Sequence, residues 1–209
     1  ISLNADGRAS FTLTADSDSV PVSLAVAGRH QVGNALAVIA AALVCGLDLS
    51  DIVATLAGAG PVSRYRMEVT TRDDGVTIVN DAYNANPESM AAALAALSTM
   101  ATGRRAWAVL GPMLELGDES DAAHRATGAD VARRGVERLI VVGAAAAEIA
   151  VGADAAYDRG DLEIDQVATT EEALAILSEQ LRPGDIVLIK SSNGAGLRFL
   201  GDQLLSPEA

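Results

Sequence analysis

The feature that most constrains the fold is a regular alternation of short apolar runs with longer amphipathic runs after about residue 62. Short apolar runs bounded by turn residues predict strands, and longer amphipathic runs predict helices. The predicted strands are 67–71, 76–79, 106–110, 138–142 and 185–189, and the predicted helices are 87–100, 118–134, 170–181 and 197–205. This order predicts a doubly wound α/β domain with a mainly parallel, Rossmann-like sheet that is buried on both faces.

The first 61 residues follow a different pattern. Residues 10–13 and 20–24 alternate apolar and polar side chains, which predicts two short strands, and helices are predicted at 30–44 and 49–57. A run of glycines ending at Pro61 then breaks the pattern. We therefore predict two domains, an α+β segment over 1–61 and the α/β domain over 62–209.

Composition narrows the range of functions. The net charge is −13, which disfavours binding to nucleic acid or to an anionic membrane surface, and the sequence has no run of eighteen apolar residues that could cross a bilayer. One cysteine and two histidines exclude an internal disulfide and a zinc cluster, and they fit a cytoplasmic location. Cys45 is expected to be a small buried residue.

Lys190 is the only lysine in the chain. A nucleotide-phosphate loop needs a Gly-Lys-Ser/Thr sequence, so that the lysine reaches the β- and γ-phosphates. Lys190 and Ser191 follow a predicted strand with no glycine before them, so the sequence contains no such loop. A chain of this kind would supply only part of an ATP site. Because the sequence begins at Ile1, we interpret it as a part excised from a longer protein.

Loops at the carboxyl ends of parallel strands are where ligands collect in such sheets. Asp81 follows one predicted strand, and its carboxylate could accept hydrogen bonds from ribose hydroxyls, although an ordinary Asx turn is the alternative. Asn86 and Pro87 predict an N-cap and first helical residue, which leaves Tyr83 and Asn84 without a structural role.

Three further segments carry polar residues. The stretch 190–196 follows the last strand and could hold a carboxylate or phosphate, or could be only a flexible turn. His30 and Asn34 lie four residues apart at the start of a predicted helix, and the Asn34 amide could match an adenine edge. Acidic residues after the loop 111–117 are better explained by the helix dipole than by magnesium, with Asp118 or Ser120 as the cap, so no metal site is predicted.

Several of these segments together resemble the Mur ligase family. The resemblance rests on Gly28–His30, Asn34–Ala37, Arg66-Met67, Asp81–Pro87, Ser89-Met90, Met113–Gly117, Ser120 and His124, which occur in this order. The string Tyr83–Pro87 is its most specific part, because sister ligases carry other sequences there. The family has a precursor-binding domain, a central ATPase domain and a C-terminal doubly wound domain. The resemblance implies that residues up to about Pro61 are the tail of the ATPase domain.

The resemblance also implies a function. It implies an ATP- and Mg²⁺-dependent ligase of peptidoglycan synthesis that joins D-alanyl-D-alanine to a UDP-N-acetylmuramoyl-tripeptide through an acyl phosphate. The ligands of Mg²⁺ would lie mostly outside this chain, no catalytic residue is assigned within it, and the chain alone is expected to be inactive. The alternatives are another amide ligase, of the cyanophycin or folylpolyglutamate type, and a non-catalytic nucleotide-binding module.

Residue roles carry over where the motifs match. ATP contacts are implied for His30, Asn34, Arg66 and Asp81. Substrate contacts are implied for Tyr83, Asn84, Asn86, Glu115, Lys190, Ser191 and Ser192. The last motif of the family usually reads Lys-Gly-Ser-Arg, whereas this chain has Lys190-Ser191-Ser192-Asn193, so the roles of Ser192 and Asn193 are the least defined.

Overall fold

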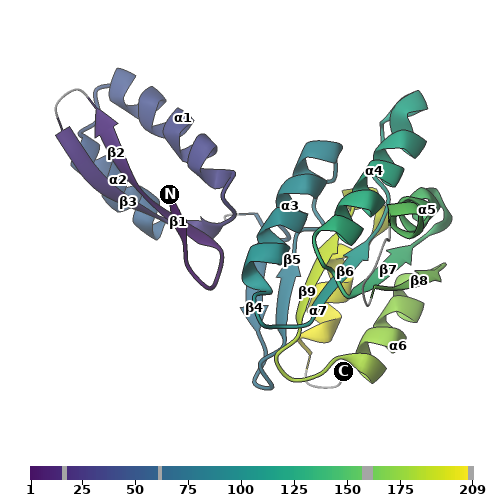
Figure 1. Cartoon of the computed structure of the whole chain (residues 1–209). Helices are drawn as coiled ribbons and strands as arrows, with labels where there is room; N and C mark the ends of the chain where they lie inside the picture. Colours follow the sequence, from purple (N-terminus) through teal and green to yellow (C-terminus); the bar gives the residue numbers. More distant parts are fainter. Residues whose placement is uncertain (16–17, 61–62, 157–161, 207–209) are drawn as a thin grey trace. The chain divides into compact units, whose positions relative to one another are not determined.

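A computed structural model describes residues 1–15, 18–60, 63–156 and 162–206. The chain divides into two compact units, Ile1–Ser63 and Arg64–Ala209, and each is described by itself (Figure 1). The boundary expected between Pro61 and Val62 falls on two residues outside the described part of the chain.

The first unit is a small antiparallel sheet with two helices. Its strands β1 (Ser2–Leu3), β2 (Arg8–Ala15) and β3 (Asp18–Ala27) pair in chain order, and α1 (Gln31–Val44) and α2 (Leu49–Gly58) follow. Val22 and Leu24 of β3 are buried against Val32 and Ala35 of α1. The alternation of apolar residues along β3 therefore turns one face of the sheet toward the helices.

The second unit is built on a six-stranded sheet with the order β4-β5-β9-β6-β7-β8. Its strands are β4 (Glu68–Thr71), β5 (Thr77–Asn80), β6 (Ala106–Leu110), β7 (Arg138–Val142), β8 (Glu163–Val167) and β9 (Ile186–Lys190). Only β4 runs antiparallel to its neighbour, and the other five strands are parallel. The mainly parallel, doubly wound sheet expected from the sequence is confirmed.

Helices cover both faces of this sheet (Figure 1). The helices α3 (Pro87–Met100), α4 (Ser120–Arg133) and α5 (Ala147–Ala156) pack as one layer, while α6 (Thr170–Gln180) and α7 (Arg198–Leu204) pack on the opposite face. The strand after α6 is β9, which inserts between β5 and β6. The helices that follow β5 and β9 therefore lie on opposite faces, which makes the carboxyl end of β9 a topological switch point.

Some local expectations were wrong. A short 3-10 helix, Gly117–Glu119, leads into α4, and neither Asp118 nor Ser120 caps it, because Glu119 occupies the N-cap position without a side-chain bond. Neither α5 nor β8 was predicted from the sequence. Cys45 is exposed rather than buried, because it lies at the C-cap of α1, beyond Val32, Ala35 and Ile39, the residues that this helix buries.

Among the described residues, no helix is both long and apolar enough to cross a membrane.

Candidate functional site

The carboxyl ends of β5, β9 and β6 lie side by side and bring three loops together. In the parallel register Asn80 is opposite Ile189, and Leu110 is opposite Lys190. Backbone bonds continue one residue further, from Asp81 N to Ile189 O at 2.9 Å and from Gly111 N to Lys190 O at 2.9 Å. Residues that are distant in sequence, Asp81 and Lys190, therefore become neighbours at the switch point.

Lys190 and Asp81 form a buried ion pair. The Lys190 Nζ lies 2.6 Å from Asp81 Oδ2 and donates a second hydrogen bond of 2.8 Å to the carbonyl oxygen of Asn84. The side chain of Lys190 is only 2% exposed, and that of Asp81 is 15% exposed. An ammonium enclosed in this way needs close acceptors to offset its lost hydration, and the loop after β5 supplies them.

The other carboxylate oxygen of Asp81 holds a turn before β4. Glu68 pairs with Asn80, so Met67 lies next to Asp81, and its N–H donates to Asp81 Oδ1 at 2.9 Å. In the same turn the carbonyl oxygen of Tyr65 accepts a 3.1 Å hydrogen bond from the Tyr83 N–H. The turn before β4 and the loop after β5 are thus joined by two hydrogen bonds.

Arg66 lies exposed in this turn. Its guanidinium carbon lies 4.2 Å from the centroid of the Tyr83 ring, which is a cation–π contact. Arg66 is exposed, and Tyr83 is 40% exposed. Within the described part of the chain the Arg66 guanidinium has no ion-pair partner, so its charge is available to an anionic ligand.

The loop after β6 is held by two side chains. The N–H of Met113 donates to His124 Nε2 at 2.9 Å, and the N–H of Leu114 donates to Ser192 Oγ at 3.0 Å. Ser192 in turn donates from its backbone to Pro112 O at 2.9 Å. Because His124 Nε2 accepts, its proton is on Nδ1, which donates to Ser120 O at 2.7 Å. Leu114 and Glu115 then face outward from a supported loop.

Strained backbone conformations occur near the carboxyl edge of the sheet. Three described residues other than glycine have positive φ, namely Tyr65 at 63°, Met67 at 48° and Glu115 at 66°. Such conformations cost about 1–3 kcal/mol each and persist where the surroundings enforce them. Tyr65 is further fixed by a 3.0 Å hydrogen bond from its hydroxyl to Asp202, and desolvation together with this bond raises the pKa of Tyr65. The strained residues mark this edge as the candidate site.

The remaining predicted residues have varied surroundings. Asn86 is the N-cap of α3, as expected. Its side chain accepts a hydrogen bond from the Ser89 N–H at 2.8 Å, and the Ser89 hydroxyl accepts one from the Asn86 N–H at 3.0 Å. The Asn84 side chain accepts from the Ala85 N–H. Ser191 is fully enclosed and donates to Ser192 O. Asn193 accepts two bonds from Arg198, both of 2.6 Å.

The predicted adenine contacts belong to the first unit. His30 occupies the N-cap position of α1 and is exposed, and its ring lies close to Gly28, whose φ is 108°. Asn34 is exposed and donates to Gln31 at 2.9 Å. Their roles stay predictions.

Two residues that support the site had no role predicted from the sequence. Asn80 is buried at the end of β5 and donates to Arg198 O at 2.8 Å, which ties this strand to α7. A polar residue at the end of an apolar strand was the available signal. His124, which the resemblance names without a role, is 1% exposed and supports the Met113 loop. Its partner is a backbone N–H, which no sequence pattern reveals.

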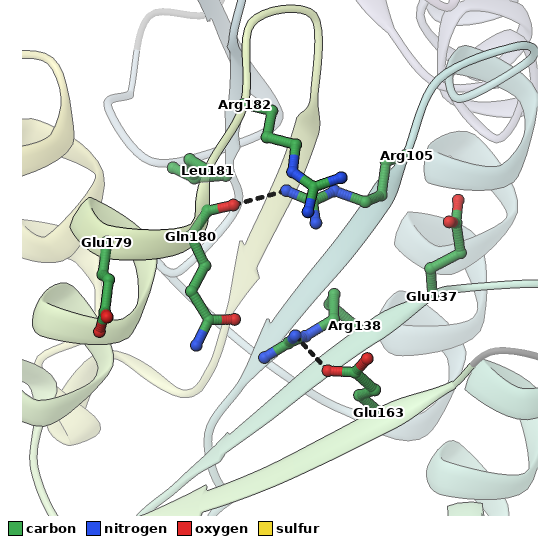
Figure 2. Close-up of a pocket in the computed structure, with 8 residues that line it drawn as sticks. All are labelled: Arg105, Glu137, Arg138, Glu163, Glu179, Gln180, Leu181 and Arg182. Atoms are coloured by element: carbon green, nitrogen blue, oxygen red, sulfur yellow. Dashed lines mark hydrogen bonds and ion pairs between the residues drawn. The ribbon is translucent and has the colours of Figure 1, made fainter.

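The opposite, amino edge of the sheet holds a cavity of about 510 Å³ (Figure 2). Its lining includes Arg105, which is paired with Asp185, and Arg138, which is paired with Glu163. Arg105 and Arg138 also lie over the Trp107 ring, at 4.9 and 4.7 Å from its centroid. The cavity lining carries three arginines and three glutamates, so it presents no net charge to a ligand.

Comparison with known proteins decides the family. The sequence model described as "Mur ligase, glutamate ligase domain" matches residues 65–193. The chain belongs to the Mur ligase family. A ligase from Mycobacterium tuberculosis named UDP-N-acetylmuramoyl-tripeptide–D-alanyl-D-alanine ligase is 46% identical over all of this chain and 44% of its own length. The ligase of the same name from Escherichia coli is 32% identical over 90% of this chain and 39% of its own length.

Solved structures of the Mur ligase family share the fold. A crystal structure of MurF from Acinetobacter baumannii superposes with a TM-score of 0.81 at 30% identity, over 96% of this chain and 43% of that one. MurF from Thermotoga maritima, solved in complex with ADP, gives a TM-score of 0.77 at 22% identity, over 99% of this chain and 46% of that one, and shows the fold alone. The chain thus spans less than half the length of each of these four relatives.

Proposed function

We propose that this chain is part of an ATP-dependent ligase that joins D-alanyl-D-alanine to a UDP-N-acetylmuramoyl-tripeptide in peptidoglycan synthesis. The observation that carries the proposal is the whole-chain similarity to mycobacterial relatives bearing that name, at 43–46% identity. The match covers the whole chain and so spans the Tyr83–Pro87 string, on which the resemblance in the sequence most depends.

The geometry supports a ligand-binding site at the carboxyl edge of the sheet rather than a complete catalytic centre. Arg66 stacks on Tyr83 and pairs with no acidic side chain among the described residues, so it suits the negative charge of a nucleotide. Asp81 keeps free lone pairs for a ribose hydroxyl. Leu114 and Glu115 are exposed on a fixed loop, where an apolar side chain and a carboxylate suit the methyl groups and the ammonium of the dipeptide. Four further residues would shape the ligand site from beneath, because their side chains already form hydrogen bonds within the protein. They are Asn84, Asn86, Ser191 and Ser192.

The described residues form neither a nucleotide-phosphate loop nor a metal site for the proposed reaction. They bring together no group of three acidic, histidine or cysteine side chains that could hold Mg²⁺. The single lysine, Lys190, is engaged by Asp81 and Asn84. We therefore assign no reaction step through ATP or Mg²⁺ to this chain, and its part in the proposed function is to bind and orient substrates.

The proposal is tested with the complete gene product. We expect release of phosphate from ATP that depends on both the tripeptide precursor and D-alanyl-D-alanine. Release driven by glutamate or by aspartate and arginine in place of the dipeptide would instead support the folylpolyglutamate- or cyanophycin-type ligase. Nucleotide binding without turnover under any of these conditions would support a non-catalytic module.

The isolated 209-residue chain provides a second test. We expect no turnover, because the phosphate-loop lysine is absent. We also expect millimolar D-alanyl-D-alanine to raise its thermal midpoint, since a ligand that binds only the folded state stabilises it by mass action. Phosphate release by the isolated chain would contradict the proposal that it supplies only part of the ATP site.

A further inference from the structure

We propose that Lys190 is a positioning residue that acts on the ligand through Arg66 rather than by contact with the dipeptide. This inference rests on the proposed function only for the identity of the ligand. The arrangement that carries it is a chain of bonds from Lys190 through Asp81 to Met67, the residue that follows Arg66.

The first link is the enclosure of Lys190. Its side chain is 2% exposed, and its ammonium has close acceptors in Asp81 Oδ2 at 2.6 Å and Asn84 O at 2.8 Å. A third oxygen, Asp81 O, lies at 3.4 Å. An ammonium has three N–H donors, so these oxygens use its full capacity. A direct bond to the dipeptide would require one of these oxygens to be released in a buried place.

The second link is the turn at Met67. Asp81 uses its other oxygen to accept the Met67 N–H at 2.9 Å, and Met67 has a φ of 48°. A methionine in this conformation is strained, and the carboxylate bond offsets that cost. Without Lys190 the Asp81 carboxylate would be free to rotate toward solvent, and the Met67 turn would lose its support.

The third link is Arg66 itself. Tyr83 lies two residues after Asp81, its N–H bonds to Tyr65 O, and its ring stacks on the Arg66 guanidinium at 4.2 Å. Lys190 fixes the same loop a second time through Asn84 O. Both components of the stacked pair, the arginine and the tyrosine, are therefore held by bonds that lead back to Lys190.

The first experiment measures amide hydrogen exchange at Met67 by NMR in the 209-residue chain. We expect Lys190→Met to speed exchange at Met67 by about tenfold or more, the change for loss of one hydrogen bond to a charged group. Exchange at Ile140, in the centre of the sheet, reports global unfolding, so the acceleration at Met67 should exceed any change measured there. The matched control is Arg125→Met, which also removes a cation from an ion pair, but on α4 opposite Glu148.

A second variant covers the case in which Lys190→Met fails to fold. Lys190→Met/Asp81→Asn leaves no unpaired buried charge, and the new asparagine can still accept from Met67. We expect Met67 to exchange rapidly in this variant too, because the bond to Asn84 O is absent. Slow, wild-type exchange would show that Lys190 only balances the charge of Asp81, and would overturn the inference.

The second experiment is a double-mutant cycle in the complete gene product, with ADP affinity as the readout. We expect Lys190→Met and Arg66→Met each to weaken ADP binding by about tenfold, as for loss of one charged hydrogen bond. The double variant should be no worse than Arg66→Met alone, because Lys190 acts through Arg66. Additive losses, or a rise in KM for D-alanyl-D-alanine with ADP affinity unchanged, would overturn the inference.

The two experiments separate this inference from the proposed function. If the gene product shows no dipeptide-dependent phosphate release, the proposed function fails, yet Met67 exchange still tests the Lys190 network. If the ligase activity is present but Met67 exchange is unaffected by Lys190→Met, the positioning role alone fails.

Discussion

The two ends of strand β9 each carry a buried ion pair, and the pairs serve different purposes. Asp185 precedes the amino end of β9 and bonds Arg105 at 2.6 Å, while Lys190 closes the carboxyl end and bonds Asp81 at 2.6 Å. The two ion pairs are alike in that both are largely buried, have the same N–O distance and join one cation to one carboxylate. None of these properties by itself therefore identifies a functional site.

The surroundings of the two pairs make the difference. Asp185 also accepts from the Trp107 indole at 2.9 Å and from the Arg182 N–H at 3.0 Å, so its carboxylate joins a strand, a loop and a core side chain. The residues around Lys190 include strained Met67 and the outward-facing Arg66 and Tyr83. One pair closes the fold, and the other supports exposed groups that remain available to a ligand.

The largest effect should follow from Asp185→Ala. This change leaves Arg105 and the Trp107 N–H without their acceptor, and we expect the free energy of unfolding to fall by about 3–5 kcal/mol, as for a broken buried pair. Urea denaturation measures it. Met67 exchange should be unaffected in the folded fraction, and the comparison between the two edges fails if it accelerates as in Lys190→Met.

A smaller effect is expected from His124→Leu at the carboxyl edge. The Met113 N–H loses its buried acceptor, which costs about 1–3 kcal/mol of unfolding free energy. His124→Gln is the matched variant, because its amide oxygen can still accept from Met113. We expect the glutamine variant to keep D-alanyl-D-alanine binding and the leucine variant to weaken it, measured by calorimetry on the complete gene product. Equal binding by both would argue against a role for the Met113 loop.

The smallest effect should follow from Glu163→Gln at the amino edge. Glu163 pairs with Arg138, but its side chain is 69% exposed, so we expect a change below about 1 kcal/mol in unfolding free energy. Binding of ADP and of D-alanyl-D-alanine should match the wild type. A loss of affinity for either ligand would show that the cavity in Figure 2 communicates with the carboxyl edge.

Much of the fold could be predicted from local sequence. Apolar runs and helix signals placed β6, β7 and α3 at their observed bounds, and Asn86-Pro87 predicted the N-cap of α3. Two elements were not predicted, because their apolar and polar residues do not alternate clearly along the sequence. The helix α5 lies in an alanine-rich stretch without a clear polar face, and β8 is a half-exposed edge strand that carries polar residues.

The candidate site was predictable as a set of loops and unpredictable as a set of contacts. Local sequence was enough to place Asp81, the Met113 loop and Lys190 after strands, because strand ends and turns depend on neighbouring residues. The insertion of β9 between β5 and β6, which brings Lys190 against Asp81, 109 residues away, is visible only in the folded protein. Strand order depends on packing of both sheet faces at once, which no local pattern contains.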